Sequence, residues 1–194
     1  MNIEYEATFP NINKDEIRQR LLSAGASLIK PEFFLKRNVF HLPKGNEVEG
    51  GFLRVRDEGD KITMSMKVIK EKGIEDQEEL CLTVNDFNQA SEFLGVIGCT
   101  QKSYQETKRE TWEFDGVEID IDEWPFLEPF VEIEGSSEEA VRSVSEKLGF
   151  DYSQALFCSA GTLYSKKYGL PATSINKTPM ITFEMENPFL KLLK

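Results

Sequence analysis

The stretch Gly116–Glu134, G-V-E-I-D-I-D-E-W-P-F-L-E-P-F-V-E-I-E, decides the fold of this chain. Apolar and acidic residues alternate before its Pro-containing turn, and the alternation resumes after the turn. Because side chains alternate between the two faces of a strand, the stretch predicts two strands, each with one apolar and one acidic face. The acidic positions are Glu118, Asp120, Asp122, Glu132 and Glu134.

A single strand of this kind would be interpreted as half-buried with a solvated outer face. Two consecutive strands with a carboxylate at every outward position are different, because like charges on adjacent strands repel one another. Positive charge is therefore expected among them, either from Arg and Lys on neighbouring strands or from a divalent cation.

The other predicted strands are also nearly uniform in the sign of their charge. The charged positions are Glu4 and Glu6 on Asn2–Phe9, Arg54 and Arg56 on Phe52–Arg56, Lys67 on Ile62–Val68, Glu79 on Gln77–Val84, and Arg109 on Tyr104–Phe114. The segment Phe33–Leu42 is a further strand. An ordinary sheet surface mixes charges of both signs, so this sorting indicates strands arranged around a common centre.

Four helices with apolar stripes are predicted between the strands. They run from the N-cap Asn13 to Gly25, over Asp86–Ile97, from Ser136 or Ser137 to Gly149, and over Ser153–Lys167. Helices that bury apolar stripes need the apolar faces of the strands as partners, which turns the charged faces inward. The predicted fold class is α+β: a closed antiparallel eight-stranded β-barrel with a charged lumen and helices packed outside.

Composition excludes several classes of function. The net charge of −11 argues against a nucleic-acid partner, and no apolar run is long enough to span a membrane. Three scattered cysteines and an N-terminus unlike a signal peptide favour a cytoplasmic protein. A single histidine excludes multi-histidine zinc sites, so any metal would be oxygen-ligated.

A lumen that holds both basic side chains and carboxylates suits a polyphosphate chelating Mg²⁺ or Mn²⁺. Arginine and lysine bind phosphate oxygens, and carboxylates bind hard divalent cations. The chain has no phosphate-binding loop of the G-x-x-x-x-G-K-[ST] type, so this would not be a P-loop enzyme.

The order, spacing and sign of these charges, over about residues 1–168, resemble the CYTH family of triphosphate tunnel metalloenzymes, which includes class IV adenylyl cyclases and thiamine triphosphatases. Glu4 and Glu6 match its Glu-x-Glu-x-Lys strand, and Arg54 and Arg56 match its Arg-x-Arg strand. The other matches are Lys67, Glu79, Arg109, Asp120, Asp122, Glu132 and Glu134. Thr8 and Thr107 stand where the family usually has lysine, so the lumen would lose two positive charges.

The resemblance implies a role for each of these residues. Phosphate would be bound by Arg54, Arg56, Lys67 and Arg109. Mg²⁺ or Mn²⁺ would be held by Glu4, Glu6, Glu79, Asp120, Asp122, Glu132 and Glu134, and the catalytic set would be Glu4, Glu6, Arg56 and Lys67. The substrate would be tripolyphosphate, thiamine triphosphate or ATP, attacked by water in a phosphohydrolase or by the ribose 3′-hydroxyl in an adenylyl cyclase.

Two alternatives stay open. The protein could bind a phosphorylated ligand without turnover, which the two missing lysines favour, or the strand charges could simply be solvated on the outside of a structural barrel. Residues 1–168 are expected to form the tunnel domain and residues 169–194 a tail or arm, in which Ile181–Glu186 alternates like a strand. A homodimer formed through this tail is a further hypothesis.

Overall fold

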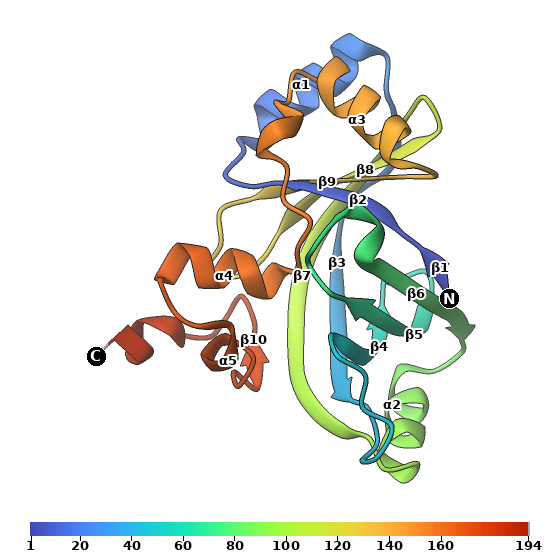
Figure 1. Cartoon of the computed structure of the whole chain (residues 1–194), viewed down its shortest axis with the longest axis vertical. Helices are drawn as coiled ribbons and strands as arrows, with labels where there is room; N and C mark the ends of the chain where they lie inside the picture. Colours follow the sequence, from blue (N-terminus) through green and yellow to red (C-terminus); the bar gives the residue numbers. More distant parts are fainter. Residues whose placement is uncertain (194) are drawn as a thin grey trace.

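The computed structural model describes residues 1–193, which form a ten-stranded sheet rolled into a nearly closed barrel with five α-helices around it (Figure 1). The strands are β1 (Asn2–Ile3), β2 (Tyr5–Phe9), β3 (Ser27–His41), β4 (Gly51–Asp57), β5 (Ile62–Ile69), β6 (Gln77–Val84), β7 (Thr100–Phe114), β8 (Val117–Glu123), β9 (Phe130–Gly135) and β10 (Met180–Ile181). The helices are α1 (Lys14–Ala24), α2 (Phe87–Val96), α3 (Glu138–Lys147), α4 (Ala160–Tyr168) and α5 (Ala172–Ile175). The predicted α+β antiparallel barrel is confirmed.

The N-terminal segment closes the barrel. The strand order is β1-β6-β5-β4-β3-β7-β8-β9-β2, so the two halves of one continuous segment lie at opposite edges of the sheet. At Glu4, between these halves, the backbone N–H donates to the carbonyl of Gln77 at 2.9 Å. The predicted strand Asn2–Phe9 is therefore two strands. This break and the added β10 explain why the sheet has ten strands rather than eight.

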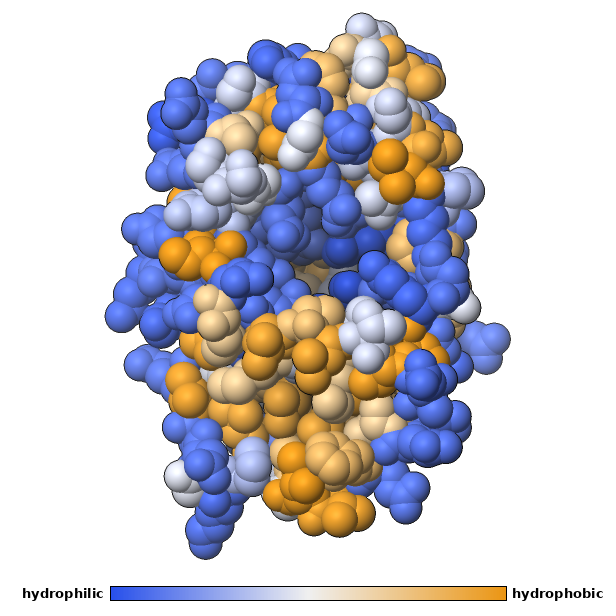
Figure 2. Space-filling view, turned by 90° about the vertical axis from the view of Figure 1, so that its right-hand side faces the viewer, coloured by the Kyte–Doolittle hydropathy of each residue, from blue (hydrophilic) through white to orange (hydrophobic). Residues whose placement is uncertain are grey.

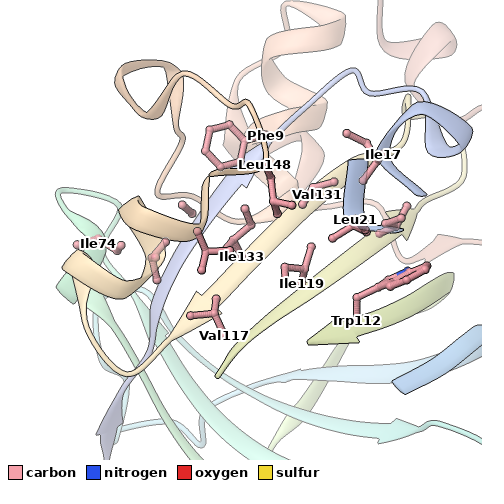
Figure 3. Packing of buried hydrophobic residues seen from close by; sticks show 14 residues of the cluster. Phe9, Ile17, Leu21, Ile74, Trp112, Val117, Ile119, Val131, Ile133 and Leu148 are labelled. Carbon is pink, nitrogen blue, oxygen red and sulfur yellow. The ribbon is translucent and has the colours of Figure 1, made fainter. Parts of the chain in front are cut away.

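The main hydrophobic core lies outside the barrel wall, between the apolar faces of β8 and β9 and the helices α1 and α3 (Figure 3). Ile119 and Ile133, which are paired across the two strands, are fully buried there. Leu21 of α1 and Leu148 at the end of α3 pack onto the same surface. Burying these apolar faces outside leaves the acidic faces of both strands to point into the barrel, as the alternation predicts.

Local sequence signals place several element ends correctly. The Asn13 side chain accepts hydrogen bonds from the backbone N–H groups of Asp15 and Glu16 and caps α1, which ends at Gly25 with a φ of 86°. Asp115 and Gly116 both have positive φ, at 54° and 75°, in the two-residue turn between β7 and β8. Such a turn matches the twist of antiparallel strands, and this explains the sharp reversal before the acidic stretch.

The predicted helix Ser153–Lys167 is wrong in its first half and right from Ala160 onward. A short 3-10 helix at Tyr152–Gln154 is followed by extended chain, and α4 begins only at Ala160. Leu156 forms a bridge with Thr8, with backbone N–O distances of 2.9 and 3.0 Å in the two directions. The segment around Leu156 thus forms backbone hydrogen bonds with the free edge of β2. These hydrogen bonds outweigh the helical preference of the segment.

The tail packs against the barrel. The predicted strand Ile181–Glu186 is wrong, because β10 covers only Met180–Ile181 and runs parallel to β7. Ile175, Ile181 and Phe189 are buried with Tyr164 of α4 in a second hydrophobic cluster. Of the predicted tail, 169–194, only Lys194 lies outside the described residues. Within residues 1–193, no helix combines the length and the apolar character needed to cross a membrane.

Candidate active site

A cavity of about 400 Å³ runs inside the barrel. Of the eleven residues singled out in the sequence, all but Asp120 line it: Glu4, Glu6, Arg54, Arg56, Lys67, Glu79, Arg109, Asp122, Glu132 and Glu134. A side view shows a hollow in the middle of the molecule, with hydrophilic residues above and beside it and hydrophobic residues below (Figure 2). The structure therefore brings the charged faces of the strands together inside the barrel, which excludes a barrel whose strand charges are all on the outside.

One wall of the cavity carries a diagonal row of cations, Arg37, Arg56, Arg54 and Lys67, here called the cation row. Arg37 of β3 lies directly opposite Arg56 of β4. Arg54 follows two residues along β4, on the same face and opposite Ser65, and Lys67 follows two residues along β5. Diagonal neighbours on one sheet face lie within reach of long side chains, so the row forms one continuous basic surface.

The acidic wall is organised around Arg109. This guanidinium forms ion pairs with Asp122 at 2.5 Å, with Glu132 at 2.6 Å, and with Asp120. Asp120, which lies behind the lining, also accepts a hydrogen bond from Thr111 at 2.6 Å. Burial raises the pKa of Asp120 to about 7 and that of Glu132 well above its usual value. Arg109 is therefore first of all the counter-ion of this crowded acidic wall.

A second charged group lies where the N-terminal segment meets β5 and β6. Lys67 forms an ion pair with Glu4 at 2.7 Å and lies 4.0 Å from Glu79, which is also paired with Arg54 at 3.0 Å. Burial and a hydrogen bond with Glu79 raise the pKa of Glu4 to about 8. The pKa of Glu79 is lowered to about 2, despite its burial, by that hydrogen bond and by Lys67 and Arg54. The two carboxyl groups thus share one proton near neutral pH.

Two functional-looking residues of the cavity region were missed in the sequence. Glu58 is buried and binds Arg56 at 2.7 Å, although it reads as part of an exposed turn. Arg37 lies at a position where its strand otherwise carries Phe33, Leu35 and Val39, so the apolar pattern hid it. The signal that could have revealed Arg37 is a single charge on the apolar face of a strand.

Arg37 also bears on the expected loss of a positive charge at Thr107. Its Nη2 donates to the Thr107 hydroxyl at 2.7 Å, and its guanidinium lies over the Trp124 ring, 4.7 Å from the centroid. A guanidinium from the neighbouring strand therefore supplies positive charge beside Thr107. Thr8 is buried and its hydroxyl has no hydrogen-bond partner within residues 1–193, so the charge expected there is not replaced in the same way.

The donor set fits a hard divalent cation in chemistry. Glu6 and Glu134 are directly opposite each other on β2 and β9, and Glu132 lies on the same face. Burial, followed by the charge of Glu6, raises the pKa of Glu134. A bound cation would therefore reduce the repulsion between these carboxylates. In the described part of the chain, however, no three ligand-type side chains converge as an ion would require. Metal binding stays a prediction, and it would require Glu132 to turn away from Arg109.

The family model described as CYTH domain matches residues 2–161. The chain belongs to the CYTH family. The match covers β1 to β9 and the beginning of α4. No sequence among the curated proteins matches this CYTH chain.

Solved structures share the fold. A conserved hypothetical protein from Pyrococcus furiosus is 20% identical with a TM-score of 0.69, and the alignment covers 82% of this chain and 99% of that protein. A candidate adenylate cyclase from Vibrio parahaemolyticus is 12% identical with a TM-score of 0.72, covering 84% and 98%. The Hippeastrum protein HpAC1, described as having a dominant triphosphatase activity, is 15% identical with a TM-score of 0.55, covering 89% and 99%. At such low identity the similarity shows the fold alone.

Proposed function

We propose that this CYTH protein is a Mg²⁺- or Mn²⁺-dependent enzyme that acts on a triphosphate compound inside its barrel. The observation that carries the proposal is the sorting of charge in the cavity, where a row of cations faces a wall of crowded carboxylates. A polyphosphate complexed with a divalent cation neutralises both walls at once. The activity described for HpAC1, which has the same fold, is consistent with this substrate class.

In this proposal the cation row holds the phosphate chain, and Arg56 and Lys67 stabilise the charge that develops on the transferred phosphoryl group. The metal would be held by Glu6, Glu132, Glu134 and Asp122, with Glu4, Glu79 and Asp120 as further ligands. It would supply electrophilic polarisation of phosphate oxygens and a lowered pKa for a bound hydroxyl group. Arg109 positions the carboxylates. It can bind phosphate only after some of its ion pairs with these carboxylates have broken.

We place hydrolysis of tripolyphosphate or an organic triphosphate first, and formation of cyclic AMP from ATP second. The specific observation against a nucleoside-binding role for the cavity tryptophan is that the Trp124 ring is already covered by the Arg37 guanidinium. Thiamine triphosphate is the second hydrolysis candidate. The cytoplasmic location and the homodimer predicted from the sequence stay predictions.

The test is a product assay with tripolyphosphate, thiamine triphosphate and ATP, each with Mg²⁺ or Mn²⁺, that resolves phosphate, pyrophosphate and cyclic AMP. R56A and E79Q should lower kcat/KM by about 100-fold or more, because each removes a charged group from the cavity. E78Q is the matched control, since Glu78 is the neighbour of Glu79 on β6 and is half exposed outside the cavity. No product from any substrate would overturn the proposal.

The alternative is a module that binds a phosphorylated ligand without turnover. The buried Thr8, whose position carries no charge, is the observation in its favour. Tripolyphosphate with Mg²⁺ would then raise the melting temperature of the wild type while no product forms. Product formation that is lost in E79Q and kept in E78Q would exclude it.

A further inference from the structure

Arg37 differs in its partners from the four cavity cations that the sequence singled out. Lys102, which also lines the cavity, has no ion pair within residues 1–193 either, but it donates to the Asn176 amide oxygen at 2.9 Å. Arg54, Arg56, Lys67 and Arg109 each form an ion pair with a carboxylate. Among residues 1–193, no carboxylate lies within ion-pair distance of Arg37, whose only hydrogen bond is to Thr107. Its Nε is buried and has no partner. A buried charge without a counter-ion is costly, so its presence in the wall of a cavity calls for an anionic partner.

The guanidinium of Arg37 is held in a fixed orientation. One face lies on the Trp124 ring, and one end donates to Thr107 at 2.7 Å. The Nε–H has no partner and lies on the same edge as Nη2, so a phosphate oxygen that accepts from Nε would bind beside the Thr107 contact. Trp124 also lines the cavity, and its buried Nε1 has no hydrogen-bond partner in residues 1–193. Two orphaned donors therefore belong to one stacked pair.

The surroundings of Arg37 are positive. Burial, followed by the charges of Arg54, Arg56 and Arg109, lowers the pKa of Arg37 well below its usual value. Asp122 acts in the opposite direction but forms no ion pair with Arg37, so an anion in the cavity would supply the missing counter-charge. Arg37 is also the last member of the cation row, at the end opposite Lys67.

We propose that Arg37, fixed on Trp124, binds the terminal phosphate group at the end of the row opposite Lys67, and so selects three phosphate groups over two. This inference rests on the proposed function and adds a determinant of chain length to it. A pyrophosphate would be held by Arg56, Arg54 and Lys67 and would not reach Arg37. A triphosphate would reach it and neutralise the unpaired charge.

The test compares R37M with K36M. Lys36 is the neighbour of Arg37 on β3, points outward to Asp57 and is half exposed, so K36M removes the same charge from the opposite face. Tripolyphosphate and pyrophosphate are titrated into each protein by calorimetry without metal, because Mg²⁺ would permit the proposed turnover of tripolyphosphate. R37M should weaken tripolyphosphate binding by about 10- to 100-fold and pyrophosphate binding by less than about threefold. K36M should leave both within about twofold of the wild type, as expected for an exposed ion pair.

A second readout separates binding from a structural role. If Arg37 serves the ligand, ligand-free R37M should melt about 2 to 6 °C higher than the wild type, because an unpaired buried charge is removed. R37K, which keeps the charge and loses the planar guanidinium with its several N–H donors, should bind tripolyphosphate about tenfold more weakly than the wild type. A lower melting temperature for R37M, equal losses for both ligands, or unchanged tripolyphosphate binding would each overturn the inference. A wild type that binds neither ligand would overturn the proposed function, and this inference with it.

Discussion

Arg109 is the residue on which the acidic wall depends. Three carboxylates, from Asp120, Asp122 and Glu132, pair with this one guanidinium. Since the pair partners are buried, removing the cation leaves several charges without compensation in a poorly solvated site. Arg109 therefore stabilises the acidic wall even when no substrate is bound.

We expect R109M to lower the free energy of unfolding by about 3 to 5 kcal/mol at pH 7.5. The difference from the wild type should shrink towards pH 5, because the buried carboxyl groups of Asp120 and Glu132, whose pKa values are already raised, become protonated and lose their need for a cation. Urea unfolding at both pH values measures this. R109K is the control, and its free energy of unfolding should fall less than that of R109M. An R109M protein as stable as the wild type would contradict the assigned role.

The Glu4–Glu79 pair predicts a second pH dependence. The pKa of Glu4 is raised from 4.5 to about 8, so its protonated form favours the fold. Its contribution is complete below about pH 4.5 and is lost as the pH rises through about 8. Glu79 behaves in the opposite way: its pKa is lowered, and its contribution is lost as the pH falls from 4.5 towards about 2.

E4Q mimics the protonated carboxyl, so it should remove the loss of stability between about pH 4.5 and pH 8. In a chelator-containing buffer, the wild type should lose about 1 to 3 kcal/mol of stability between pH 5 and pH 8.5 relative to E4Q. Unfolding by denaturant across this range provides the measurement. Parallel pH profiles for the two proteins would show that Glu4 does not carry the shared proton.

Sequence could place the acids and most of the bases in the cavity because each sits on a strand with strict alternation. Glu118–Asp122 on β8 is the clearest case, since Ile119 and Ile121 fix the parity from the opposite face. Arg37 could not be predicted in this way, because its face of β3 is otherwise apolar. Glu58 was missed for another reason: its burial depends on Arg56 in the folded hairpin, which no local pattern records.

At the scale of elements, Glu71 connects the loop after β5 to the start of α4. Its carboxylate accepts hydrogen bonds from the Ser159 N–H at 2.9 Å, the Ser159 hydroxyl at 2.8 Å and the Thr162 hydroxyl at 2.7 Å. This anion lies at the helix N-terminus, where the helix dipole favours it. The φ of Glu71 is 57°, an unfavourable value for a residue with a side chain, so the contact offsets a local strain.

E71A should expose the first turn of α4, with a loss of about 1 to 2 kcal/mol in the local opening free energy. Hydrogen exchange resolved along the chain should show faster exchange in α4 and unchanged exchange in β7 and β8. E71G loses the same hydrogen bonds but tolerates the positive φ, so it should be about 1 kcal/mol less affected than E71A. Equal exchange in all three proteins would rule out the proposed capping contact.

Gly50 and Gly45, in the loop before β4, make a matched pair. Both have positive φ, at 73° and 90°, but a Cβ on Gly50 would lie 2.2 Å from the Ile69 carbonyl oxygen, while one on Gly45 would meet nothing within 4 Å. G50A should therefore cost about 2 to 4 kcal/mol and G45A about 1 kcal/mol, because only the former adds a clash to the backbone strain. Thermal unfolding compares them. Equal losses would mean that the loop moves away from β5 without cost.

Element boundaries were predictable where a cap or turn is local and not where pairing is distant. Asn13, Gly25 and the Asp115–Gly116 turn act through their own backbone neighbourhood. The segment around Leu156 is extended because of Thr8, which is far away in the sequence. The short β10 likewise exists because β7 offers it a partner, so its length could not be read from the alternation in the tail.

For the whole molecule, the closed barrel was predictable from a single packing argument. The apolar stripes of the helices must pack on the apolar faces of the strands, and this leaves the charged faces inside the barrel. The sequence did not show how the ring is closed. The register of β1 with β6, Asn2 opposite Glu79, and of β2 with β9, Glu6 opposite Glu134, depends on chain segments more than seventy residues apart. Pairings between such distant segments cannot be predicted from the local alternation of apolar and charged residues.

The N-terminal closure also sets an order of events during synthesis. The segment that carries Glu4 and Glu6 leaves the ribosome before the other strands of the barrel, yet β2 can pair with β9 only after Gly135 has emerged. Until then the nascent sheet has two open edges, which makes it a target for unwanted pairing. The cations of β3 to β5 and the Arg109–Asp122 pair can assemble first. Glu4 and Glu6, which are synthesised before the rest of the barrel, are thus the last of its charged residues to enter the site.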